Sequence, residues 1–276
     1  MTHRPADKGS SAITFRTLVL CVALLVTNPA QAVDVNQCSM VADGFAEIVT
    51  FDARMADGTT VTLNGILAGP ADPGPLPAVV LLSGGGGPVT PYCYRLVVKK
   101  LVDWGYVTLL VAGTTAWDRD GNRVLEYSFA DMAQYASDAA AAAANLPQVD
   151  PARVGLWGHS HGGLSVIEAV SISRGAPATT FRVAIAAAPI CPARALPIAT
   201  PLLVIIGDQD KEVSPDACVD FAASHEDTIG FEFLLLSDAD HLFWNPYVPG
   251  YSETAAVLAE RRLQTFLARH LQAPLD

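Results

Sequence analysis

The sequence has few basic residues and little charge overall. Lysine and arginine account for 17 of its 276 residues, against 28 aspartates and glutamates, and the formal net charge is −11. No segment gathers basic residues among aromatic ones, which is the pattern typical of nucleic-acid-binding surfaces. Nucleic acid is therefore not expected among the partners of this protein. The acidic excess argues for solubility rather than for a particular fold.

The chain also lacks an apolar run long enough for a comfortable membrane span. Its N-terminal apolar run, residues 18–26, is shorter than the roughly 20 residues that a transmembrane helix needs. Basic residues precede this run, and the small-x-small sequence of residues 30–32 follows it. This order is typical of a secretory signal peptide and its cleavage site. We expect residues 1–32 to be removed after Ala32, leaving an exported protein, periplasmic or secreted, without a stable membrane anchor.

Cysteine is scarce, and no cysteine has the spacing of a zinc site. Four of the five cysteines remain after the expected cleavage, namely Cys38, Cys93, Cys191 and Cys218. An even number of cysteines in an exported protein favours disulfides. We expect a Cys191–Cys218 bridge, because each residue follows a predicted strand at the same edge of the sheet. A Cys38–Cys93 bridge is the weaker second expectation, and buried free thiols are the alternative.

What the chain does contain is a regular alternation of strands and helices, in a sequence that is 51% hydrophobic. Short apolar runs predict strands buried on both faces, and apolar residues at helical spacing predict helices. The expected strands are 47–54, 61–67, 78–82, 107–111, 154–157, 183–188, 201–206 and 231–236, and the main helices are 94–104, 131–146 and 253–271. The alternation predicts one α/β domain, residues 33–276, with a mostly parallel sheet and helices on both faces. Residues 114–127 and 150–153 are expected to form loops.

Residues 158–162 read Gly-His-Ser-His-Gly, which is the G-x-S-x-G pattern. They lie between the strand 154–157 and a helix expected from about Leu164. A serine on a sharp strand-to-helix turn has strained backbone geometry, and side chains two residues before and after it would collide, so glycine is needed at both places. The N-terminus of the helix would direct N–H groups at the serine oxygen. The pattern indicates that Ser160 is a nucleophile; the alternative is a loop without chemistry.

A serine nucleophile needs a base, and histidine is the usual one. His241 follows the expected strand 231–236 and should lie near Ser160, because ligand sites in such sheets lie beyond the carboxyl ends of the strands. The base in turn needs a carboxylate that fixes its tautomer. Asp210, after the preceding strand, is expected to reach it, with Asp208 as the alternative. Serine, aspartate and histidine in this chain order are typical of the α/β-hydrolases.

Two backbone N–H groups should form an oxyanion hole for the charge that develops in the transition state. One is expected from His161, directly after the nucleophile. The other is expected from Gly85 in the four-glycine run after the strand 78–82, with Gly86 as the alternative. This run lacks the Lys-Ser/Thr ending of a P-loop and the G-x-G-x-x-G of a dinucleotide fold, which argues against a phosphate site. His159 and His161 lack the further ligands of a dinuclear site, so no metal is expected.

These segments together resemble the dienelactone hydrolase-like branch of the α/β-hydrolase superfamily. The resemblance covers roughly residues 45–270 and rests on residues 150–154, the turn 158–163, Gly207-x-x-Asp210, and His241 followed by Phe243. It implies an α/β-hydrolase fold with eight strands, a Ser160–His241–Asp210 triad and no cofactor. The chain departs from the family at two places. The family often has His-Gly where this chain has Ser83-Gly84, and its original members have cysteine in place of Ser160.

The predicted reaction is hydrolysis of small carboxylic esters or lactones through an acyl-enzyme. Only residues 189–200 separate two strands at the usual lid position, so no large cap is expected and the substrate pocket should be fairly open. Tyr92, Trp117 and Trp244 are expected to line this pocket, with ordinary packing as the alternative. Two other functions fit the same residues or scaffold: a peptidase or amidase with the same triad, and a non-catalytic binding protein.

Overall fold

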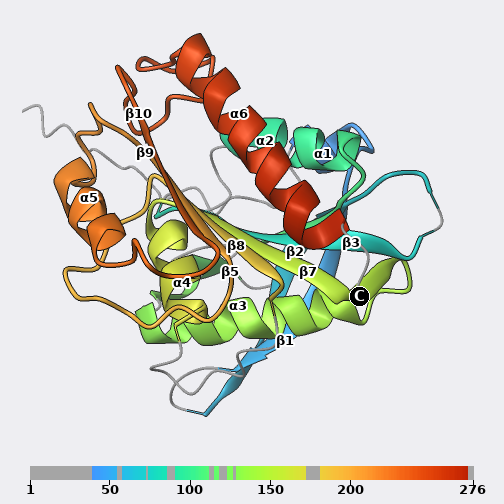
Figure 1. The fold of residues 1–276 in the computed structure, drawn as a ribbon. Coiled ribbons are helices and arrows are strands. Elements are labelled where there is room, and N and C mark those ends of the chain that lie inside the picture. The colour runs from blue at the N-terminus through green and yellow to red at the C-terminus, as the bar shows by residue number, and fades with distance from the viewer. Residues whose placement is uncertain are drawn as a thin grey trace, which may run out of the picture. The chain divides into compact units, whose positions relative to one another are not determined.

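The centre of the fold is an eight-stranded sheet (Figure 1). The computed structural model describes residues 39–54, 58–72, 74–85, 91–111, 115–117, 123–126, 129–171 and 181–272. The strand order is β1-β2-β4-β3-β7-β8-β9-β10. These strands are β1 (Glu47–Arg54), β2 (Thr60–Ala68), β3 (Leu76–Leu82), β4 (Val107–Val111), β7 (Val149–His159), β8 (Val183–Ala187), β9 (Leu202–Gly207) and β10 (Phe231–Leu236). The fold class and the strand number therefore agree with the prediction.

The direction of the strands decides where the loops meet. β1 pairs antiparallel with β2, and β2 antiparallel with β4. All the other neighbours, from β4 through β3 and β7 to β10, pair parallel. The carboxyl ends of β3, β7, β9 and β10 thus lie at one edge of the sheet. The segments that follow these strands carry the predicted functional residues.

Helices cover the sheet on both faces, as predicted. One face holds α1 (Ser39–Ala42), α2 (Pro91–Asp103) and α6 (Glu253–Leu267), the last continued by a π-helical segment, Ala268–Gln272. The other face holds α3 (Phe129–Ala144), α4 (His161–Ala169) and α5 (Pro215–Ala223). Figure 1 shows the two sets on opposite sides of the strands. The sheet is thereby the middle of three layers.

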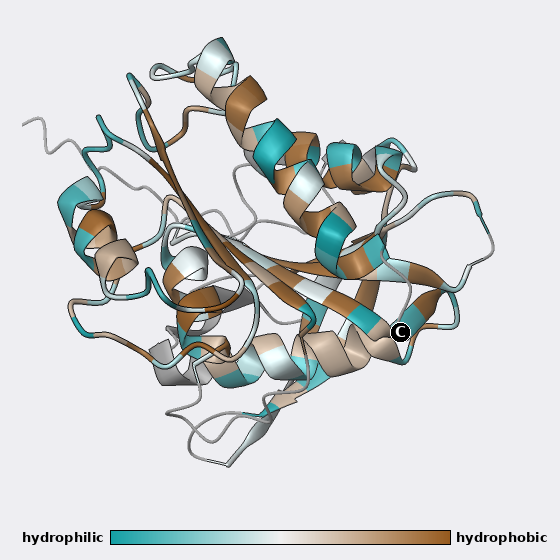
Figure 2. Ribbon diagram, in the orientation of Figure 1, coloured by the Kyte–Doolittle hydropathy of each residue, from teal (hydrophilic) through white to brown (hydrophobic). Residues whose placement is uncertain are grey.

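The apolar strands explain this layering, because successive side chains of a strand point to opposite faces. In β9, Leu202, Val204 and Ile206 belong to the buried cluster that includes residues of α3, α4 and α5. Leu203 and Ile205 belong to the cluster on the opposite face, which includes residues of α2 and α6. Figure 2 shows the middle strands as mostly brown along their length, whereas α6 alternates between brown and teal faces. A strand that is apolar on both sides requires cover on both sides, so the two helix layers follow from the sequence.

Three local predictions were wrong. Residues 150–153 belong to β7, although the pairing with β3 shifts from Leu76–Val149 to Ala78–Val154, so this part of the strand is irregular. The expected loop 114–127 contains a short antiparallel hairpin of β5 (Thr115–Trp117) and β6 (Arg123–Glu126). Helix α4 begins at His161 rather than near Leu164. Polar residues in these first two segments, and the proline at position 151, made strands difficult to predict there.

The predicted disulfide is present. Cys191, just after β8, is bonded to Cys218 in α5. Cys38 and the side chain of Cys93 lie outside the described residues, so the second predicted bridge stays a prediction. Among the helices of the described ranges, none combines the length and apolar character that a membrane crossing requires.

Candidate active site

Ser160 lies on a sharp turn between β7 and α4 and has the unusual backbone angles φ 56° and ψ −117°. A positive φ is costly for a residue with a side chain and is found mainly where the surrounding structure enforces it. Here the Ser160 N–H donates to the carbonyl of Ala187 at 3.0 Å, and the Ser160 carbonyl accepts the Leu164 N–H. The Ser160 side chain makes no helix-capping hydrogen bond. The turn therefore holds the hydroxyl outside the helix rather than using it as a cap.

The glycines around Ser160 are required by close backbone contacts. A Cβ on Gly158 would lie 2.2 Å from the carbonyl oxygen of Gly162, and a Cβ on Gly162 would lie 2.4 Å from the carbonyl oxygen of Leu82. Carbon and oxygen atoms cannot approach so closely without moving the backbone. The clash at Gly158 lies within the turn, as expected from the sequence, whereas the clash at Gly162 is with the end of β3.

His241 and Asp210 form a buried pair next to this turn. The Nδ1 atom of His241 lies 2.7 Å from Oδ2 of Asp210, and the two side chains are 4% and 0% exposed. Oδ1 of Asp210 accepts the N–H groups of Glu212 and Val213 at 2.9 and 3.0 Å. These bonds fix the carboxylate, which in turn orients the imidazole. Asp208, the alternative, instead accepts the N–H of Asp238 at 2.9 Å.

The loops after β9 and β10 are tied together, and this brings Asp210 to His241. The N–H of Asp208 donates to the carbonyl of Leu236, and the N–H of Gln209 donates to the carbonyl of Ala239. A Cβ on Gly207 would lie only 2.0 Å from that Ala239 oxygen, so the close approach requires glycine. The other nitrogen of His241, Nε2, lies 3.6 Å from an oxygen of Glu212, an exposed side chain that the sequence did not single out.

The His241 ring reaches the β7 turn through His159. The two imidazole ring centres are 4.7 Å apart, although β8 and β9 separate their strands in the sheet. Burial lowers the pKa of His159 well below its ordinary value. His159 is therefore neutral at physiological pH. Sequence reasoning did not predict this contact, because it depends on where the loop after β10 folds back.

The predicted oxyanion loop lies beside the serine. A Cβ on Gly84 would lie 3.3 Å from the Cβ of Ser160, and a Cβ on Gly85 would lie 3.2 Å from Nδ1 of His161. His161 is the first residue of α4, so its N–H lies at the N-terminus of this helix. Gly86 lies outside the described residues. The described part of the glycine run thus comes close to both Ser160 and His161.

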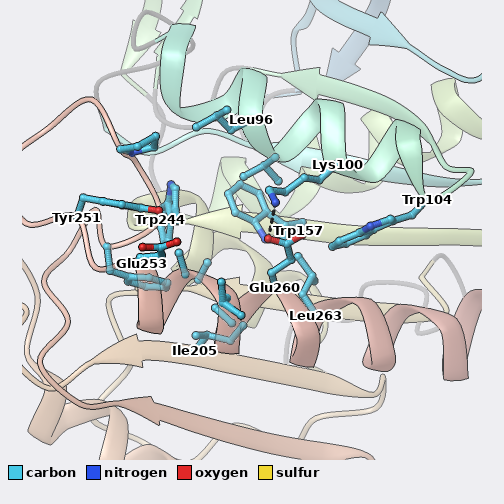
Figure 3. Close-up of a pocket in the computed structure, with 17 residues that line it drawn as sticks. Leu96, Lys100, Trp104, Trp157, Ile205, Trp244, Tyr251, Glu253, Glu260 and Leu263 are labelled. Carbon is cyan, nitrogen blue, oxygen red and sulfur yellow. Dashed lines mark hydrogen bonds and ion pairs between the residues drawn. The ribbon is translucent and has the colours of Figure 1, made fainter.

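A pocket of about 320 Å³ lies between α2 and α6, above the strands β7, β8 and β9 (Figure 3). Trp244 lines it, but Ser160, His241 and Asp210 are not among its described lining residues, so the role of Trp244 in a substrate pocket stays a prediction. Figure 3 shows Trp104 at one end of the pocket, Trp244 and Tyr251 at the other, and the Lys100–Glu260 ion pair between the two helices. The side chains of Tyr92 and Trp117 lie outside the described residues. Their predicted role stays a prediction.

Another buried histidine, His225, has a structural role. His225 is buried, with Nδ1 2.7 Å from the carbonyl of Phe221 and Nε2 2.8 Å from the carbonyl of Leu196. It lies just after α5, and both of its ring nitrogens have hydrogen-bond partners in the backbone. Within the described residues, no group of three or more histidine, cysteine, aspartate or glutamate side chains is placed to hold a metal ion.

Solved structures with the same fold are numerous. A chain from Klebsiella pneumoniae subsp. pneumoniae MGH 78578, provisionally assigned as a dienelactone hydrolase, has a TM-score of 0.63 and 18% identity over 81% of this chain and 99% of its own. A dienelactone hydrolase-like promiscuous phosphotriesterase from metagenomic libraries has a TM-score of 0.62 and 20% identity over 82% and 99%. Esterase 2 of Thermogutta terrifontis, phosphorylated by paraoxon, has a TM-score of 0.61 and 20% identity over 84% and 97%. At these identities the likeness establishes the fold.

The family assignment rests on the sequence. No curated protein sequence matches the chain. The sequence model of the dienelactone hydrolase family matches residues 63–271, which span the sheet from β2 to the end of the described chain. The matched region contains the serine turn, the loop with Asp210 and the loop with His241. The chain belongs to the dienelactone hydrolase family.

Proposed function

We propose that this protein is a serine hydrolase that cleaves small carboxylic esters or lactones through an acyl-enzyme. The observation that carries the proposal is the 2.7 Å contact between His241 and Asp210, beside a glycine-enforced turn that holds Ser160. A buried carboxylate on Nδ1 leaves Nε2 as the basic nitrogen of the imidazole, which is the atom that a general base must offer. Membership of a hydrolase family supports the same reaction class.

The proposed reaction has two halves. In the first, Oγ of Ser160 attacks the ester carbonyl carbon while Nε2 of His241 takes the hydroxyl proton. The N–H groups of His161 and Gly85 stabilise the oxyanion, and the imidazolium then protonates the leaving alcohol. In the second half, water attacks the acyl carbon as it loses a proton to His241. The bond between the acyl carbon and Oγ of Ser160 then breaks, the imidazolium returns its proton to Oγ, and the acid leaves. Asp210 stays ionised and stabilises the imidazolium throughout.

The segment between β8 and β9 contains no helix that could form a cap, so the site should be fairly open, and the proposed substrates are small-molecule esters or lactones. The named activities of the structural relatives point the same way. They include an esterase phosphorylated by paraoxon and a promiscuous phosphotriesterase. Organophosphates modify a nucleophile that is activated for acyl transfer, so this chain is expected to react with them at Ser160.

The test is turnover of p-nitrophenyl esters of increasing acyl length, combined with fluorophosphonate labelling. Ser160→Ala is expected to abolish labelling and to lower kcat by about 10⁶-fold. Ser165→Ala is a matched control, because Ser165 is a buried serine of the same helix whose hydroxyl donates to a backbone carbonyl. The anilide of the same acid separates an esterase from an amidase. Undiminished turnover by Ser160→Ala would contradict the proposal and would favour a binding protein on a hydrolase scaffold.

The proposal includes export of the protein. Residues 1–32 would act as a signal peptide, and residues 33–276 would form a single hydrolase domain in the periplasm or outside the cell. Expression of the full chain followed by N-terminal sequencing of the exported protein tests this. A mature N-terminus at or next to Val33 is expected, whereas a chain retained with Met1 intact would contradict it.

A further inference from the structure

His159 is a buried polar side chain that the reaction described above does not use. It is 6% exposed, and its Nε2 atom has no hydrogen-bond partner within the described part of the chain. Its ring centre lies 4.7 Å from that of His241 and 4.6 Å from that of Trp244. An unpartnered buried nitrogen costs free energy, so a position that retains it calls for an explanation.

Tyr94 of α2 links His159 to the oxyanion loop. Its hydroxyl oxygen accepts the N–H of Gly84 at 2.6 Å and lies 3.4 Å from Nδ1 of His159. The tyrosine is 3% exposed, and its ring packs edge-on against Trp157 at 6.2 Å between centres. The hydroxyl therefore holds a defined position among buried groups. Gly84 directly precedes Gly85, whose N–H is a proposed oxyanion donor.

We propose that Tyr94 and His159 are positioning residues for the ester hydrolysis proposed above, on which this inference rests. The hydroxyl of Tyr94 anchors the loop that carries the oxyanion donor, and the ring of His159 supports one side of His241. The chain has Ser83-Gly84 where the family often has His-Gly, so the tyrosine supplies an anchor from a helix rather than from the loop itself. A single buried chain of contacts then runs from the base, through His159 and Tyr94, to the backbone of Gly84.

Two physical reasons support this assignment. Backbone donors stabilise an oxyanion only when they are held within a fraction of an ångström of their working position, and a displacement of about 1 Å costs about 100-fold in rate. In addition, the imidazolium that forms on His241 would be repelled by a charged neighbour. His159 stays neutral because of its burial, so it contacts His241 without opposing protonation of the base.

The experiment is a double-mutant cycle with Tyr94→Phe and His159→Phe, assayed on an ester whose turnover Ser160→Ala abolishes. Tyr94→Phe removes one hydroxyl and keeps the ring. We expect kcat to fall about 10- to 100-fold with KM changed less than about threefold, because only the transition state uses the positioned donor. His159→Phe should lower kcat similarly, and the double variant should lose much less than the product of the two effects.

Tyr106→Phe is the matched control, because Tyr106 is equally buried in the same hydrophobic cluster but lies outside this chain of contacts. It should keep the wild-type kcat. If Tyr94 and His159 had only a structural role, their substitution would lower the melting temperature. The fall in kcat would then not exceed the change in KM, and the effects of the two substitutions would not be coupled. A Tyr94→Phe variant with kcat within twofold of the wild type, or effects of the two variants that simply multiply, would overturn the positioning role while leaving the proposed function intact. Full turnover by Ser160→Ala would overturn the proposed function and this inference together.

Discussion

The disulfide between Cys191 and Cys218 closes the part of the chain that presents Asp210. The two cysteines are 27 residues apart, and the loop between them contains β9 and the aspartate turn. Replacing both with alanine removes the crosslink while keeping each Cβ. The crosslink lowers the conformational entropy of the unfolded chain. For a loop of this length, this raises the free energy of the unfolded state by about 3.5 kcal/mol. The double variant is therefore expected to be less stable than the oxidised wild type by about that amount.

Urea unfolding followed by tryptophan fluorescence measures this difference, since Trp157 and Trp244 lie in the packed region between the sheet and α6. The slope of the free energy of unfolding against urea concentration reports how much surface unfolding exposes. This slope should be steeper in the variant, because its denatured state is more expanded without the crosslink. Thermal unfolding should show a loss of about 7–14 °C for a domain of this size.

The matched control is the wild type under reducing conditions, which should unfold like the double variant, whereas the double variant should not respond to reductant. A loss below about 1 kcal/mol would refute the reasoning, because the entropy of a loop of this length could not then be the stabilising factor. A loss of turnover at temperatures where the variant is still folded would show that the bridge also fixes Asp210.

The remaining predictions concern the site residues. Asp210→Asn should lower kcat by about 10⁴-fold, since the amide favours the wrong histidine tautomer, and Asp208→Asn should stay within a few-fold when both are assayed on one ester. Gly158→Ala should lower the free energy of unfolding by about 3 kcal/mol or prevent folding, because its Cβ would lie 2.2 Å from the Gly162 oxygen. A soluble variant of unchanged stability would contradict that contact. Burial lowers the pKa of His159, so below a pH of about 6.5 the unfolded state binds more protons than the folded state. The free energy of unfolding should therefore fall on acidification below that pH, by up to about 1.4 kcal/mol per pH unit. His159→Phe should reduce this pH dependence of the free energy of unfolding, measured by urea titrations at several pH values.

Much of the fold could be predicted because its strands are continuous apolar runs. The predicted strand 231–236 coincides with β10, and 107–111 coincides with β4. The failures came where polar residues lie within strands, as in the irregular part of β7 at 150–153 and in the hairpin within 114–127. Whether such residues join a strand depends on the neighbouring strand rather than on their own composition.

The sequence alone determined the turn at Ser160, because its cause is local. The contact between Gly158 and Gly162 lies within the turn and leaves a pattern that can be read along the chain, although Gly162 is also constrained by the distant carbonyl of Leu82. It also indicated which loops follow the parallel strands. The family match to residues 63–271 bears out the assignment that these segments suggested.

Only the tertiary structure decided which side chains meet at that edge. Asp210 rather than Asp208 contacts His241, because hydrogen bonds between the loops after β9 and β10 use Asp208 elsewhere. The contacts of His159 with His241 and Tyr94, and the pocket between α2 and α6, likewise depend on how distant segments pack. A sequence motif mainly reflects contacts between residues that are close together in the chain. Contacts between segments far apart in sequence form only when the sheet and its helices fix the distances between them.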